Sequence, residues 1–195
     1  MKENRTSEIM EADLSSTMLA IAAWGGNNVE SLPWITPPPA GHVAEAKRLL
    51  MMLGAVDING VITSHGLKLS KMPCHPRIAN MLISANSNRL ISIAADIAAL
   101  LEDRDPLRDE NDIDINSRIT MLRRQRRDNR PLWRRTQQIA AHYRHLGAIK
   151  EDNCDATPDE TGRLIALAYP ERIAQRQPDG AYKLASGIRV SVDKN

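Results

Sequence analysis

Phenylalanine is absent from this chain of 195 residues, and aromatic side chains together supply only 3% of it. The strands of a β-sandwich favour aromatic and β-branched side chains, because these pack well on a pleated surface. A core without phenylalanine has to be built mainly from leucine, isoleucine, alanine and methionine, which suit packed helices. The shortage of aromatic residues therefore predicts a mainly α protein.

Cysteine is almost as scarce, since only Cys74 and Cys154 are present. Two cysteines do not make the disulfide framework of a small secreted protein, and they predict a reducing, cytoplasmic location. Cys74 precedes His75, but no second pair completes a four-ligand zinc site. We find no signal peptide and no apolar run of the length that crosses a membrane. We expect a monomer with no metal-ligating residue and no membrane contact.

The motifs of nucleotide hydrolysis are missing as well. A phosphate-binding loop needs a glycine-rich turn followed by Lys and then Ser or Thr, and none of the ten glycines precedes such a pair. No Asp-Glu-x-His sequence is present to hold Mg²⁺. We therefore expect no catalytic residue, no cofactor and no ATP hydrolysis in this chain.

The segment 37–75 has the pattern of a small helix–hairpin–helix unit. Three prolines at 37–39 precede an amphipathic pattern that ends at Gly54, as a helix with a left-handed C-cap would. Asn59-Gly60 lies between two short apolar segments and is typical of a type I′ hairpin turn, which needs positive φ at both residues. Thr63 or its neighbour is suited to cap a short helix that extends to residue 72. Together these signals predict a winged-helix module.

The remaining segments complete a four-part organisation. Residues 1–36 indicate an N-terminal helix, over about 8–24, and a linker. Residues 76–169 show repeated helical periodicity, which predicts a helical bundle; within them 90–101 are apolar nearly all round and indicate its buried helix. A capping box with proline at the first helical position, Thr157-Pro-Asp-Glu, predicts a further helix start. Within residues 170–195, short segments with the pattern of strands alternate with turn residues, which predicts a short antiparallel β segment.

Arginines are concentrated in the eighteen residues 118–135, which contain a single acid, Asp128, in a protein of net charge +2. Crowded like charges repel unless an anion is near, and guanidinium groups bind phosphate in a bidentate manner and stack on bases. We predict that this cluster binds nucleic acid, with Lys68 and Lys71 as secondary candidates. The cluster consists of Arg118, Arg123, Arg124, Arg126, Arg127, Arg130, Arg134 and Arg135.

The apolar spacing around the cluster predicts which arginines face solvent. Those expected to project outward are Arg123, Arg124, Arg127, Arg130, Arg134 and Arg135. Two alternatives to nucleic-acid binding stay open. The arginines could pair with the acidic segment 102–114, which holds seven carboxylates, or form an ordinary solvated face.

Several separated segments follow one another in a characteristic order. They are EIMEADLSSTMLAIAAWG (8–25), LPWITPPP (32–39), LGA (53–55), DINGVITSHG (57–66), PCHP (73–76), ML (81–82), IAALLEDRDPLR (97–108) and LIALAYPERIAQRQPDGAYKLASG (164–187). In this order they resemble the region after the motor domains of DEAH-box helicases, most of all in the bacterial HrpB-type branch.

The resemblance implies an accessory region of an ATP-dependent RNA helicase, with a ratchet-like helical bundle and the start of an OB-like domain. It implies that ATP and Mg²⁺ belong to motor domains that lie outside this chain. It also implies that this region contacts single-stranded RNA or DNA and transmits the motion of those motor domains. Two other functions are weighed against it: a stand-alone winged-helix regulator that reads duplex DNA, and a protein-interaction scaffold whose arginines serve only the acidic segment.

Overall fold

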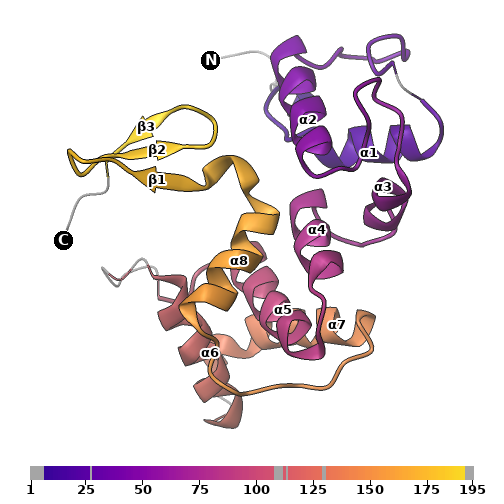
Figure 1. The fold of residues 1–195 in the computed structure, drawn as a ribbon. Helices are drawn as coiled ribbons and strands as arrows, with labels where there is room; N and C mark the ends of the chain where they lie inside the picture. Colours follow the sequence, from indigo (N-terminus) through magenta and orange to yellow (C-terminus); the bar gives the residue numbers. More distant parts are fainter. Residues whose placement is uncertain (1–6, 27, 108–111, 113, 129–130, 192–195) are drawn as a thin grey trace, which may run out of the picture. The chain divides into compact units, whose positions relative to one another are not determined.

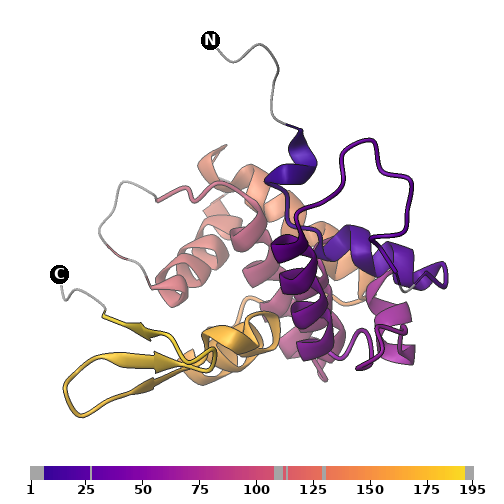
Figure 2. The ribbon, with the colours of Figure 1, turned by 90° about the horizontal axis from the view of Figure 1, so that it is seen from above.

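The computed structural model describes residues 7–26, 28–107, 112, 114–128 and 131–191, and of residues 127 and 128 only the backbone (Figures 1 and 2). Helices dominate, as the composition predicts. The chain forms two compact units, residues 1–80 and 81–195, and the boundary falls within helix α4 (Pro76–Ser84). The finer four-part division at residues 36, 75 and 169 stays a prediction. No helix in the described part of the chain is long and apolar enough to cross a bilayer.

The first unit contains short helices packed through small and aliphatic side chains. Before α4 its helical elements are η1 (Glu8–Met10), α1 (Ser15–Ala23), α2 (Ala40–Met52) and α3 (Ser64–Leu69). Helices α1 and α2 contact each other. Met18 and Leu19 of α1 and Val43 and Leu50 of α2 are all buried. The helix expected over 8–24 is thus split into a 3₁₀ turn and a shorter α-helix.

Helix α2 ends in the left-handed glycine cap that its sequence predicts. Gly54 has a φ of 66°. The amide of Gly54 donates to the carbonyl of Met51 at 2.9 Å, and that of Ala55 donates to the carbonyl of Leu50 at 2.8 Å. These two bonds are the Schellman pattern, which satisfies carbonyls at the end of a helix.

The turn that follows differs from the predicted type I′ turn. Gly60 has a φ of 79°, whereas Asn59 is not among the described non-glycine residues with positive φ. The carbonyl of Asp57 accepts from Gly60 N at 3.0 Å, and its carboxylate accepts from the amides of Asn59 and Val61, each at 2.9 Å. This is a three-residue loop with the left-handed residue at its end, for which one positive φ suffices. The prediction of two positive φ values is wrong, because the Asp57 side chain organises a different turn.

The hairpin around this turn is minimal, and a short helix follows it. Pairing is reduced to one bridge between Val56 and Ile62. The Thr63 side chain then accepts a bond from Gly66 N at 2.9 Å, which confirms Thr63 as the cap of α3. Helix α3 ends at Leu69, three residues before the predicted end.

The second unit is organised around α5 (Asn88–Glu102). Its other elements are α6 (Ile115–Asp128), η2 (Pro131–Trp133), α7 (Arg134–Leu146), α8 (Pro158–Ala168) and η3 (Pro170–Arg172). Helix α5 contacts α6, α7 and α8 (Figure 1). Eight consecutive α5 residues, 92–99, are buried, and four of them are alanines that allow close helix approach. The prediction that this helix is the buried one is confirmed.

Helix α8 begins with the predicted capping box. The Thr157 hydroxyl accepts from the amide of Glu160 at 3.2 Å, and the Glu160 carboxylate accepts from the amide of Thr157 at 2.9 Å. Arg89 of α5 donates from Nε to the same carboxylate at 2.6 Å. The Arg89 guanidinium and the Thr157 amide lower the pKa of Glu160 to about 2. Glu160 thereby both starts α8 and fastens it to α5.

The chain continues into a three-stranded antiparallel sheet. Its strands are β1 (Ala174–Arg176), β2 (Tyr182–Leu184) and β3 (Arg189–Val190), paired in the order β1-β2-β3. Gly180 and Gly187 occupy the two connecting turns with φ of 86° and 88°. The predicted β meander is confirmed, with strands of two or three residues.

Replacing Gly54 with alanine should destabilise the protein by about 1 kcal/mol, because a Cβ is strained at positive φ. The matched control is Gly41→Ala in α2, where an added Cβ meets open space at ordinary helical φ. There the change should be neutral or stabilising by up to about 1 kcal/mol. Urea unfolding of both variants measures the sign of the change in the free energy of unfolding at each position. An unaltered midpoint for Gly54→Ala would refute the cap.

The Glu160 anchor makes stability depend on pH in a defined direction. The folded pKa of about 2 lies below the ordinary value of 4.5, so the stabilisation is complete above pH 4.5 and is lost as the pH falls toward 2. In urea unfolding, Glu160→Gln should be less stable than the parent at pH 6, and the difference should shrink at pH 3. Glu45→Gln, at an exposed position of α2, serves as the control. A difference that does not change with pH would contradict this account.

Candidate nucleic-acid interface

The predicted arginine cluster spans α6, η2 and the start of α7, and the structure divides it by burial. Arg118, Arg123 and Arg126 are buried or nearly so, with side chains 11%, 2% and 7% exposed. Arg124, Arg134 and Arg135 are exposed. Arg130 and the side chain of Arg127 lie outside the described residues. The cluster is therefore two sets of arginines with different surroundings.

The buried set surrounds one carboxylate, that of Asp96 in α5. Arg123 donates from Nε to Asp96 Oδ2 at 2.8 Å, and Arg144 of α7 donates from Nη1 to Oδ1 at 3.0 Å. Arg126 donates from Nη2 to Oδ1 as well. Asp96 is fully buried, and Arg144 is only 5% exposed. We call these four residues the Asp96 hub.

The hub corrects the expectation that Arg123 projects outward. A carboxylate without water is stable only when it is paired and hydrogen-bonded, so Asp96 draws arginines inward from two neighbouring helices. Burial and the like charge of Arg126 lower the pKa of Arg144. Arg123 and Arg126 also donate to the loop before α8, to the carbonyl of Cys154 and to Asn153 Oδ1, the latter at 2.7 Å. The hub thus joins α5, α6, α7 and this loop.

Two further arginines pair with the acidic segment. Arg118 donates from Nε to Asp105 at 3.0 Å, and Asp112 lies 4.0 Å from its Nη1. Arg135 lies 3.2 Å from Asp103, although its side chain is 81% exposed. Arg118 and Arg135 thus form the kind of ion pair with the acidic segment that the first alternative describes.

Arg124 and Arg134 remain as exposed cations that make no ion pair with another described residue. Arg124 lies on α6, and Arg134 is the first residue of α7. In the first unit, Lys68 lies on α3 and Lys71 just after it, and both are exposed. Among the described arginines of the cluster, Arg124 and Arg134 are the most available to an external anion.

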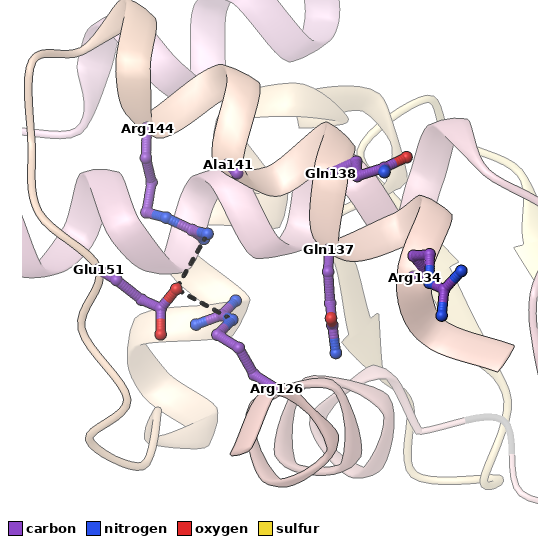
Figure 3. Close-up of a pocket in the computed structure, with 7 residues that line it drawn as sticks. All are labelled: Arg126, Arg134, Gln137, Gln138, Ala141, Arg144 and Glu151. Atoms are coloured by element: carbon purple, nitrogen blue, oxygen red, sulfur yellow. Dashed lines mark ion pairs between the residues drawn. The ribbon is translucent and has the colours of Figure 1, made fainter. Parts of the chain in front are cut away.

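A hollow of about 400 Å³ opens beside the hub. Figure 3 shows Glu151 between Arg126 and Arg144, and Gln137 reaching from α7 toward α6. The residues that line the hollow are Arg126, Arg134, Gln137, Gln138, Ala141, Arg144 and Glu151. Arginine and amide donors predominate in this lining.

Comparison with known proteins shows which proteins this chain is similar to. Residues 75–147 match the helicase associated domain (HA2), ratchet-like. The chain is 32% identical over 191 residues to the ATP-dependent RNA helicase HrpB of Escherichia coli, covering 96% of this chain and 21% of that protein. The chain matches the helicase-associated region of HrpB.

The similarity to HrpB extends to the fold. The crystal structure of the E. coli DExH-box NTPase HrpB matches 97% of this chain and 22% of its own, with a TM-score of 0.77 and 30% identity. The probable ATP-dependent RNA helicase DHR1 of Saccharomyces cerevisiae is 30% identical over 109 residues, covering 56% of this chain and 9% of that protein. The chain spans about a fifth of the length of HrpB.

All four members of the Asp96 hub lie within the ratchet-like match, 75–147. Sequence reasoning missed Asp96 and Arg144. Asp96 is the single acid in an apolar run, and that is the available signal, because a lone charge in a buried helix requires a partner. Arg144 lies outside the dense cluster and carries no local signal of burial.

The hub should be central to stability. Asp96→Asn keeps the shape of the side chain but leaves three buried guanidinium groups without their carboxylate, so the free energy of unfolding should fall by roughly 3 kcal/mol or more. The control is Asp159→Asn in α8, whose ion pair with Arg163 spans 3.7 Å with both side chains 79% exposed. Its loss should cost about 0.5 kcal/mol or less. Urea unfolding of both variants measures these losses. Equally small losses of unfolding free energy in the two variants would refute a central role of the Asp96 hub in stability.

Proposed function

We propose that this region serves an ATP-dependent RNA helicase by contacting a single strand of nucleic acid and by transmitting the motion of motor domains. The observation that carries the strand contact is that Arg124 and Arg134 are exposed, without a described ion-pair partner, within a ratchet-like match. Guanidinium groups of this kind bind backbone phosphates and stack on bases. The E. coli relative is named an ATP-dependent RNA helicase, which favours RNA as the strand.

The burial of several arginines reduces the number that can contact a nucleic-acid strand. Arg118, Arg123 and Arg126 are committed to internal carboxylates, so a strand would meet only the arginines that remain. The proposed contacts are Arg124 and Arg134, with Arg135 able to turn from Asp103 because its side chain is exposed. Arg127 and Arg130 are further candidates from the sequence. ATP and Mg²⁺ would be bound by the motor domains of the same protein.

Transmission of motion is supported by the Asp96 hub. The hub ties three helices and the loop before α8 through charged hydrogen bonds, and each helix contributes at least one member. Because removing any partner leaves a buried charge uncompensated, sliding one helix past another is costly. The bundle would therefore move as one body and pass a displacement to the bound strand with little loss.

A winged-helix regulator of duplex DNA is the less supported alternative. A recognition helix in a major groove needs several residues that reach base edges. Helix α3 has six residues and one cation, Lys68, while Lys71 follows its end. Duplex binding that exceeds single-strand binding would nevertheless favour this alternative.

Fluorescence anisotropy with a labelled single-stranded RNA tests the proposal. Two to four phosphate contacts predict a slope of log affinity against log salt of roughly −1.4 to −2.8, since each contact contributes about −0.7. Arg124→Glu combined with Arg134→Glu should abolish measurable binding and leave the melting temperature nearly unchanged, because both positions are exposed.

The matched control reverses the same number of charges at Arg163 and Arg172, whose side chains are 79% and 72% exposed. Binding should persist in this control. Equal loss in both double variants would indicate general charge attraction, and no loss in either would place the contact elsewhere.

A further inference from the structure

The hollow between α6, α7 and the segment before α8 has an excess of positive charge at its wall. Arg126, Arg134 and Arg144 line it, and Glu151 is the single carboxylate of the lining. Asp96 pairs with Arg126 and Arg144 and also with Arg123, so it brings one more negative charge and one more positive charge into the balance. The balance over these six groups is four cations against two anions.

Buried donors in this wall lack partners. Arg126 Nε and Gln137 Nε2 are both shielded from solvent and make no hydrogen bond in the described part of the chain. The Arg126 side chain is only 7% exposed. A buried donor left unpaired costs about 1–3 kcal/mol, so such groups are normally paired with a ligand or ordered water. Arg126 and Gln137 belong to facing helices, and both line the hollow (Figure 3).

Glu151 does not satisfy these donors. Its Oε2 lies 3.7 Å from Arg126 Nε and 3.6 Å from Arg144 Nη2, beyond hydrogen-bond length in both cases. Its side chain is 43% exposed. Its Oε1 accepts from Asn153 Nδ2 at 2.7 Å. The carboxylate therefore makes only long ion pairs with the two arginines, and a stronger acceptor could take its place beside them.

We propose that this hollow binds a phosphate group. A tetrahedral oxyanion presents several acceptors at once, as required by donors that converge from α6 and α7. Arg126 Nε and Gln137 Nε2 would donate to it, and Arg134 and Arg144 would supply charge, while Glu151 swings toward solvent. The phosphate is either a free inorganic ion or one unit of a nucleic-acid backbone. The proposal does not depend on strand binding, because the ion alone fits the same donors.

The test measures binding of inorganic phosphate to the whole chain by isothermal titration calorimetry, at fixed ionic strength maintained with sodium chloride. Phosphate should bind with measurable heat, and Glu151→Gln should tighten binding by about tenfold, because it removes a negative charge that competes for the same cations. Arg134→Gln should weaken binding by a similar factor. Arg163→Gln on α8 should bind as the parent does.

A higher phosphate affinity of Glu151→Gln distinguishes a phosphate site from a purely structural network. A purely structural role for Glu151 predicts no tighter binding. Circular dichroism confirms that each variant is folded. Undetectable phosphate binding in the parent and in Glu151→Gln overturns the proposal, as does equal weakening by Arg163→Gln and Arg134→Gln.

The source of the phosphate is assigned by competition with labelled single-stranded RNA at the same ionic strength. If phosphate displaces RNA and Glu151→Gln also tightens RNA binding, the hollow receives the backbone of a strand. If phosphate binds and RNA is unaffected, the hollow is a site for the free ion. Phosphate binding without any RNA binding would refute the proposed function and leave this site standing.

Discussion

The carboxylate of Asp96 is the constraint on which the second unit depends. It lies within eight consecutive buried residues of α5, where water is excluded, and three guanidinium groups compensate it. Those arginines come from α6 and α7, so the electrostatics of one residue fix the approach of two helices. The alanines around Asp96 allow those helices close enough for the contacts to form. Packing and charge thus favour the same arrangement.

The same constraint explains why only a few arginines of the dense cluster 118–135 have exposed side chains. Local charge density indicated a surface, yet Arg123 and Arg126 are turned inward by Asp96, which precedes them by 27 and 30 residues. Arg118 and Arg135 are held by carboxylates of the acidic segment. Among the described arginines, the nucleic-acid contact proposed for this unit is therefore restricted to those whose side chains stay exposed, Arg124, Arg134 and Arg135.

Much of the architecture was predictable, because its signals are local. The glycine cap at Gly54, the Thr63 cap and the Thr157 capping box each depend on residues a few positions apart. The turn at 57–61 was mispredicted because the Asn-Gly preference is weaker than two hydrogen bonds to the Asp57 carboxylate. The composition of the candidate site could not be predicted, since which arginine meets Asp96 is decided by helix packing across many residues.

The order of the hub along the chain bears on its synthesis. A ribosome releases α5 first, and the partners of Asp96 follow 27, 30 and 48 residues later. Until α6 has emerged, a nascent α5 that buried itself would place a lone carboxylate in an apolar interior, which is strongly unfavourable. The three charges that neutralise Asp96 are complete only after Arg144 has left the exit tunnel. We therefore expect the bundle to close late in synthesis.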